Sequence, residues 1–135
     1  MELISYRQLL IVEDQLKQIR EAIHNLQSWN EKYQNADDFL ISPDGMKTLA
    51  ADCMLIEAIG EGIRRIDEKT KQQLLILRPE IPWEQVKGIR DHIAHGYFDI
   101  NNELIWDVIH NDLEPLLAAI NFFIEHLFKL IPFSD

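Results

Sequence analysis

A short segment near position 90, reading GIRDHIAHGYFDI from position 88, holds a dense group of residues that can bind or move charge. Arg90, Asp91, His92, His95 and Tyr97 fall within eight positions. Arginine provides a permanently charged, planar donor that fits a phosphate group, and histidine can give or take a proton near neutral pH. A helix cap or a surface ion pair would explain one such residue alone. Five together indicate a functional site.

Chemistry on a phosphodiester fits this group best. RNA carries its own nucleophile, the 2′-hydroxyl, so a site that holds only arginine and histidine can cleave RNA without a metal ion. Arg90 and His95 are five residues apart near the expected end of a helix, and both can reach one cleft if the last turn bends. We therefore expect Arg90 to stabilise negative charge on the phosphate and His95 to transfer protons.

Other chemistries find less support in the same segment. His92 and His95 have i, i+3 spacing and Asp91 could add a carboxylate, but no HExxH or CxxC pattern supplies further metal ligands. No serine or cysteine adjoins the histidines, and no glycine-rich phosphate loop is present. The role of His92 stays open between a cap, a second proton donor and no function. Glu57 and Glu61 either orient Arg90 or are simply solvated.

Composition places the chain among soluble globular proteins of one domain, spanning residues 1–135. It has 135 residues, 47% hydrophobic and 27% charged, with a net charge of −10. No apolar run is long enough for a signal or a membrane span, and the one cysteine, Cys53, is expected in the core. We therefore expect a cytoplasmic protein with no membrane association.

The negative net charge argues against binding nucleic acid over the whole surface. Residues 64–90, however, hold 7 basic against 4 acidic side chains and form a net-positive segment that ends at the arginine of the motif. On charge alone, a solvated helix face with paired charges is slightly favoured. The alternative is a local basic rim that serves RNA.

Apolar spacing predicts an all-α chain, an up-and-down bundle of four main helices. The first helix spans roughly residues 3–34, and the second begins at Ser42 as N-cap with Pro43 in the first position and ends near Glu68. The third begins at Pro82, and the last covers roughly residues 102–130. The expected apolar stripes are Leu9, Val12, Leu16, Ile19, Ile23 and Leu26; Leu49, Met54, Ile56, Ile59, Ile63 and Ile66; and Ile105, Val108, Ile109, Leu113, Leu116, Ile120, Phe123 and Leu127.

Proline and glycine mark places where these helices should depart from regularity. Pro115 is expected to kink or restart the last helix, with Asn111 or Asp112 as a new cap. The three glycines at positions 60, 62 and 88 are unfavourable inside helices. We expect them to form a closely packed face, one that a second subunit could share.

The motif and its surroundings resemble the HEPN superfamily, and more narrowly the HepT-type toxins of bacterial and archaeal toxin–antitoxin pairs. The likeness rests on Arg90-x4-His95-x-Tyr97, preceded by MLIEAIGEGIRRI and PEIPWEQVKGIRD and followed by IWDVIHNDLEPLL, from roughly Met54 to Leu117. The first helix is similar only in length and in its amphipathic pattern.

The resemblance implies an α-helical bundle that forms a homodimer, with two Arg/His motifs facing one cleft. It implies a ribonuclease that needs no metal or other cofactor, with Arg90 and His95 as catalytic residues and Asp91 as the polar residue of the motif. It also implies the toxin of a type VII-like toxin–antitoxin system, silenced when an MntA-type nucleotidyltransferase antitoxin transfers AMP to Tyr97. The alternative is a non-catalytic HEPN helical binding module that partners a nucleotidyltransferase.

Overall fold

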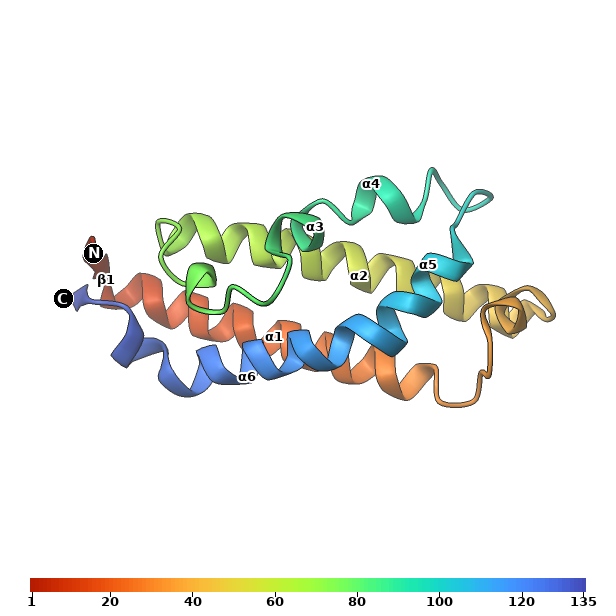
Figure 1. Ribbon diagram of the computed structural model, residues 1–135, viewed down its shortest axis with the longest axis horizontal. Helices are drawn as coiled ribbons and strands as arrows, with labels where there is room; N and C mark the ends of the chain where they lie inside the picture. The colour runs from red at the N-terminus through yellow and green to blue at the C-terminus, as the bar shows by residue number, and fades with distance from the viewer.

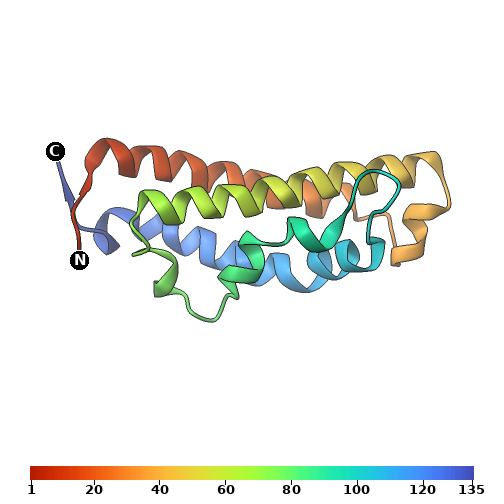
Figure 2. The ribbon, with the colours of Figure 1, turned by 90° about the horizontal axis from the view of Figure 1, so that it is seen from above.

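The computed structural model describes all of residues 1–135 and shows an elongated helical bundle (Figure 1). The helix α1 (Tyr6–Trp29) runs along the bundle and α2 (Pro43–Lys69) returns beside it. Two short helices, α3 (Trp83–Lys87) and α4 (Arg90–Ile93), lie along α2, and α5 (Asn102–Asp107) and α6 (Leu113–Leu130) run back to the starting end. Figure 2 shows the same order from above. The predicted all-α, up-and-down architecture is confirmed.

A small parallel sheet, not expected from the sequence, joins the two ends of the chain. In it, β1 (Ile4–Ser5) pairs with β2 (Phe133–Ser134), and both termini lie at the same end of the bundle (Figure 1). The first helix therefore begins at Tyr6 instead of position 3, with the Ser5 hydroxyl accepting a hydrogen bond from the Gln8 amide at 3.0 Å. It ends at Trp29, because the chain then turns into the short 3₁₀ helix η1 (Ala36–Leu40).

The apolar stripe of α1 is buried as predicted, but the stripe of α2 needs a correction. Met54, expected in the core, is 72% exposed, and the fully buried residue on that part of the helix is Asp52. Leu49, Asp52 and Ile56 are spaced by 3 and 4 residues and therefore share one face of the helix. The predicted helical period is correct, but the core position was assigned to the apolar Met54 instead of the charged Asp52. The start of α2 is as predicted: the Ser42 hydroxyl accepts from the Gly45 amide at 3.0 Å, and Pro43 follows it.

The last helical segment is continuous but changes its winding where the prediction placed a kink or restart. Between α5 and α6, the residues Val108–Asp112 form a π-helical turn, η3. Pro115 has no N–H for the carbonyl four residues earlier, and its ring would clash with that carbonyl in a regular helix; a wide turn just upstream relieves both problems. Asp112 is the residue before α6, yet its side chain makes no capping bond. The predicted apolar stripe of this segment is buried.

Close packing through glycine is found within the chain. A Cβ atom built on Gly60 would lie 2.8 Å from the carbonyl oxygen of Val86, so only glycine lets the end of α3 lie this close to α2. A Cβ atom on Gly62 would meet only the end of the Ile19 side chain of α1, at 3.2 Å, which is a milder restriction. Gly88 differs, because it caps the end of α3 and does not lie inside a helix. The predicted sharing of this face by a second subunit stays a prediction.

The core lies between the three long helical segments, and aliphatic residues dominate it. Cys53 is buried there, as expected. None of the helices combines the length and the apolar character needed to cross a membrane.

Candidate active site

The motif segment begins where α3 ends. The third helix was predicted as one piece from Pro82, but it is divided into α3 and α4 at Gly88 and Ile89. The amide of Gly88 donates to the carbonyl of Glu84 at 3.1 Å, and the amide of Asp91 then donates to the carbonyl of Gly88 at 3.2 Å. These bonds carry the chain through a tight corner, so that α4 starts directly at Arg90.

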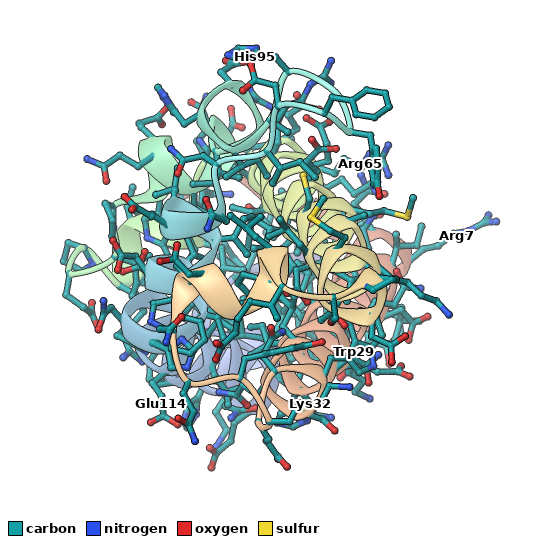
Figure 3. The ribbon with its side chains drawn as sticks, turned by 90° about the vertical axis from the view of Figure 1, so that its right-hand side faces the viewer. Arg7, Trp29, Lys32, Arg65, His95 and Glu114 are labelled. Atoms are coloured by element: carbon teal, nitrogen blue, oxygen red, sulfur yellow. The ribbon has the colours of Figure 1, made fainter.

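The candidate residues all project from this corner and from the loop that follows it. Arg90, Asp91 and His92 are exposed on α4, whereas Ile93 is fully buried and fixes the helix to the core. The helix ends there, and His95 lies exposed just beyond it. Seen along the bundle, His95 stands at the outer edge of the molecule (Figure 3). The structure thus places the predicted site on one short, outward-facing segment.

Residues 94–101 form a closed loop that holds His95 and Tyr97. Ala94 and Ile100 pair as an antiparallel bridge, and the amide of Asn101 donates to the carbonyl of Ile93 at 2.8 Å. The amide of His95 donates to the carbonyl of Asp99 at 3.0 Å across the loop. Gly96 has a φ of 105°, a conformation that disfavours residues with side chains, so the turn depends on this glycine.

The aromatic residues of the loop are exposed. Tyr97 is 52% exposed and Phe98 is 98% exposed, with their rings packed edge to face at 5.2 Å between centroids. Tyr97 is therefore not a core tyrosine, and its hydroxyl makes no hydrogen bond within the chain. The residue is accessible from outside the bundle.

The side chains of the predicted site form no ion pairs or hydrogen bonds with the rest of the chain. This is notable for Arg90, because the chain has 23 carboxylate residues that could have neutralised it. Neither of the glutamates considered as partners contacts it: Glu61 pairs with Arg64 at 3.7 Å, and Glu57 lies beside Cys53. The guanidinium of Arg90 is thus free to bind an anion.

Four of the seven basic side chains of the net-positive segment, in contrast, are paired with carboxylates: Arg64, Lys71, Arg78 and Lys87. Arg65 and Lys69 make no ion pair. Lys71 Nζ lies 3.7 Å from Glu2 Oε2, and Arg78 Nε lies 2.6 Å from Glu80 Oε2. Lys87 contacts two carboxylates, those of Asp67 at 2.6 Å and Glu84 at 3.1 Å. The paired-charge interpretation of this segment therefore fits the structure better than a continuous basic rim, and Arg90 is the unpaired arginine within the motif.

Two of the three histidines outside the motif pack against aromatic rings, and the third, His24, is exposed on α1. His110 stacks on the ring of Trp106 with 3.7 Å between centroids, and a nitrogen of its ring lies 2.9 Å from the Trp106 carbonyl oxygen. His126 packs against Phe122. No group of three or more His, Cys, Asp or Glu side chains comes together in a way that could hold a metal ion.

An apolar cavity of about 280 Å³ lies beside α3. It is lined by α2, α3, α5 and α6, and includes Ile56, Ile59, Val86 and Ile89. Arg90, His95 and Tyr97 are not among its lining residues. The exposed motif residues therefore lie outside this cavity.

Sequence reasoning missed one buried polar pair in the core. Asn30 donates from Nδ2 to Asp52 Oδ1 at 2.8 Å and to the Leu26 carbonyl at 2.8 Å, while Asp52 Oδ2 and Asn30 Oδ1 have no partner. Burial raises the pKa of Asp52 to about 7, although the bond from Asn30 opposes this. The 3-and-4 spacing of Asp52 within the stripe of α2 was the signal that could have found it.

Fold and site together define a class of protein: a small all-α bundle that presents an Arg-x4-His-x-Tyr segment, free of internal partners, at one edge. A family model described as "Ribonuclease HepT-like" matches residues 10–122. The chain therefore belongs to the HepT-like ribonuclease family, and the resemblance predicted from the sequence is confirmed.

Individual relatives agree with this assignment. A protein of Thermococcus cleftensis named "Probable ribonuclease HepT" is 31% identical over 104 residues, which cover 77% of this chain and 87% of the relative. A protein of Methanocaldococcus jannaschii named as a candidate RNase is 35% identical over 75 residues, 56% of each chain. A further candidate RNase, from Caldanaerobacter subterraneus, is 28% identical over 61 residues. The matched part covers about half the length of the Methanocaldococcus and Caldanaerobacter proteins. No solved structure gives a significant match.

Proposed function

We propose that this protein is a metal-independent endoribonuclease in which Arg90 and His95 are the catalytic residues and Asp91 is the polar residue of the motif. Membership of the HepT-like ribonuclease family supports the reaction. The observation that carries the assignment of residues is the exposed, unpartnered Arg90 on a helix that Ile93 anchors firmly in the core. Five residues on, His95 is exposed at the start of a closed loop.

The reaction would proceed by attack of the RNA 2′-oxygen on the adjacent phosphorus. His95 takes the proton of the 2′-hydroxyl, the O2′–P bond forms, and the P–O5′ bond breaks. Arg90 binds the non-bridging oxygens through its planar fork and stabilises the negative charge that builds on them. The departing 5′-oxygen takes a proton, and the products are a 2′,3′-cyclic phosphate and a 5′-hydroxyl. His92 is a candidate accessory residue, exposed on the same helix.

The protein would act as a homodimer in which two copies of the motif face one cleft. One exposed arginine gives a single phosphate contact, and a net charge of −10 otherwise repels RNA. A two-fold axis beside α4 would double the arginines and would supply a second His95 to protonate the leaving oxygen. The site would thereby gain both the acid and the base that the reaction needs.

Tyr97 would be the point of control. We propose that the chain is the toxin of a type VII-like toxin–antitoxin pair that acts in the cytoplasm, and that an MntA-type nucleotidyltransferase antitoxin adds AMP to Tyr97. The 52% exposure of Tyr97 and its place two residues after His95 support this role. An AMP group there adds a bulky phosphodiester whose charge can occupy the Arg90 guanidinium and exclude RNA.

The test is cleavage of RNA by purified protein in the presence of a chelator, with Arg90→Ala, His95→Ala and Arg90→Lys as variants. We expect the wild type to cleave RNA and all three variants to lose most of this activity. Arg90→Lys should also lose it, because a lysine cannot reproduce the bidentate contact of arginine with a phosphate. Activity that vanishes with EDTA and returns with zinc would overturn the mechanism in favour of a metal site at His92 and His95. A wild type that binds RNA or a nucleotidyltransferase without cutting would favour the binding module.

A further inference from the structure

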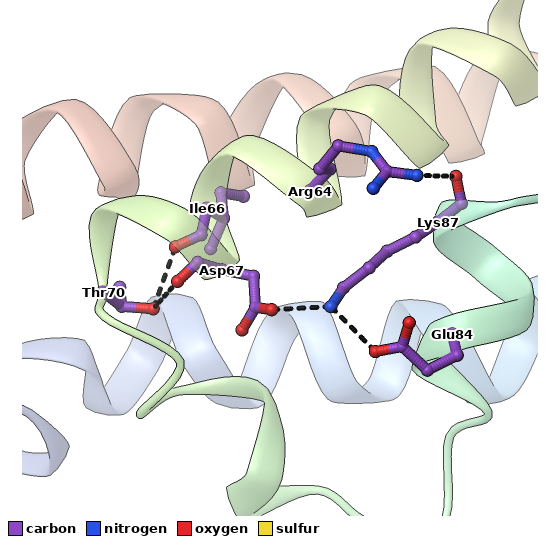
Figure 4. Close-up of polar contacts among 6 residues, drawn as sticks. All are labelled: Arg64, Ile66, Asp67, Thr70, Glu84 and Lys87. Carbon is purple, nitrogen blue, oxygen red and sulfur yellow. Dashed lines mark hydrogen bonds and ion pairs between the residues drawn. The ribbon is translucent and has the colours of Figure 1, made fainter.

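The segment that carries Arg90 is fastened to α2 by polar contacts three residues before the arginine (Figure 4). The ammonium group of Lys87 donates to Asp67 Oδ2 at 2.6 Å and to Glu84 Oε1 at 3.1 Å. From α2, Arg64 Nη2 donates to the backbone carbonyl of the same lysine at 3.0 Å. Residue 87 is thus held through its side chain and through its backbone. We call Arg64, Asp67 and Lys87 the α3 clamp.

The ion pair at the centre of the α3 clamp is shielded from water. The side chains of Lys87 and Asp67 are each only 12% exposed. Burial alone would lower the pKa of Lys87, but the hydrogen bonds that its ammonium group donates to Asp67 and Glu84 outweigh burial, and the pKa is raised. Exposed ion pairs contribute little because solvent screens them. A shielded pair depends strongly on geometry, and the loss of one partner leaves the other uncompensated.

Backbone packing supports the same junction. The carbonyl of Val86 lies directly over Gly60, where a Cβ would approach it to 2.8 Å, and the side chain of Ile89 lies against the same glycine. The end of α3 therefore contacts the backbone of α2 at Gly60, and Lys87 pairs with Asp67 two helical turns further along α2. These contacts restrict the backbone conformations that are open to the junction between α3 and α4.

Hydrogen bonds transmit this constraint to the motif. The amide of Ile89 donates to the carbonyl of Val86 at 3.4 Å, and the amide of His92 donates to that of Ile89 at 2.9 Å. Arg90 stands between these bonds, and the buried Ile93 fixes the far end of α4. The Arg90 side chain has no partner of its own, so the backbone is what fixes the point and direction at which it leaves α4.

We propose that Arg64, Asp67 and Lys87 are positioning residues for the proposed ribonuclease, and that the α3 clamp aims Arg90 at the phosphate without contacting RNA. This inference rests on the proposed function. It also assigns a task to Lys87 other than the one its charge suggests: the lysine belongs to the scaffold and contributes nothing to an RNA-binding rim.

The test compares variants that open the α3 clamp with one that weakens α2 at the same end. Asp67→Asn and Lys87→Met keep the size of each side chain and remove its charge. The control is Thr70→Val, since the buried Thr70 hydroxyl bonds only to the carbonyls of Ile66 and Asp67 within α2 (Figure 4). Each full-length variant is measured for kcat and KM on one RNA, for Tm, and for amide hydrogen exchange over residues 88–95.

We expect the two clamp variants to lose about 10- to 100-fold in kcat, with a smaller change in KM, because a displacement of an ångström is costly in the transition state. Asp67→Glu, which keeps the carboxylate, should recover part of the loss. The rate of amide hydrogen exchange over residues 88–95 should rise in the clamp variants. In Thr70→Val it should stay at the wild-type level, even if the Tm of that variant falls.

Two results would overturn the inference. One is a kcat that falls in Thr70→Val as much as in Asp67→Asn at equal loss of Tm, which would make the α3 clamp merely structural. The other is unchanged exchange over residues 88–95 in Asp67→Asn. Failure of the wild type to cleave any RNA would instead count against the proposed ribonuclease, and the exchange measurement would still decide whether the α3 clamp holds the motif.

Discussion

Replacing Asp52 with asparagine should stabilise the protein, and the gain should depend on pH. Asp52 is completely buried, one of its oxygens has no partner, and burial raises its pKa from the ordinary 3.8 to about 7. At about 1.36 kcal/mol per pKa unit, this difference corresponds to at most about 4 kcal/mol of unfavourable free energy once the carboxylate is charged. An amide of the same shape carries no charge, so its burial does not carry this cost at any pH.

The sign of the pH dependence follows from proton uptake. Below about pH 4 the carboxyl is protonated in the folded and unfolded chains alike, so its charge has no effect on stability. Between about pH 4 and 7 only the folded chain keeps the proton, and stability falls as the pH rises. Above pH 7 the loss is complete. Asp52→Asn should therefore differ little from wild type near pH 4 and exceed it by up to about 4 kcal/mol at pH 8.

Urea unfolding of both proteins at pH steps from 4 to 9 gives the difference directly, and other titrating groups cancel in the comparison. The neighbouring Cys53 does not interfere, since burial and then the nearby Glu57 raise its pKa to about 11. An Asp14→Asn variant serves as the control, because Asp14 is exposed on α1. Parallel stability curves for wild type and Asp52→Asn over the whole range would refute the reasoning.

The other predictions concern the proposed site. Expression of the chain without its partner should slow bacterial growth, and Arg90→Ala or His95→Ala should restore it; equal toxicity of both variants in growth curves would speak against a catalytic role. Co-expression with an adjacent nucleotidyltransferase should add AMP-sized increments to the intact mass, and Tyr97→Phe should abolish them while leaving toxicity. Increments that persist in Tyr97→Phe would place the modification elsewhere. Light scattering at micromolar concentration should give a dimer, and a clean monomer of 15.9 kDa would contradict the two-copy site.

The sequence predicted the long helices well because their apolar residues recur at the helical period and their starts carry local capping signals. Ser42 and Pro43 needed only neighbours in the chain to form their cap. Met54 was misplaced, and Asp52 was overlooked, for the opposite reason: residue type was given more weight than position, although Asp52 continues the 3-and-4 spacing of the stripe. A buried carboxylate is rare, and only its partner Asn30, 22 residues away, makes it acceptable.

The candidate residues of the site were also predictable, since the motif is local, but their surroundings were not. Lys87 counted as part of a basic segment, whereas the structure pairs it with Asp67, 20 residues earlier on another helix. The corner at Gly88 depends on the packing of Val86 over Gly60. Contacts of this kind arise between elements that are distant in sequence, and no periodicity within one helix reveals them.

The central claim, that this chain cleaves RNA through Arg90 and His95 with the 2′-hydroxyl as nucleophile, is tested most directly by the ends of the product. The measurement is mass spectrometry of an oligonucleotide cut by purified protein in EDTA, beside the same oligonucleotide with a 2′-deoxy sugar at the cleaved position. We expect a 2′,3′-cyclic phosphate and a 5′-hydroxyl from the first, and no cleavage of the second. Products with a 3′-hydroxyl and a 5′-phosphate, or cleavage at the 2′-deoxy position, would contradict the account.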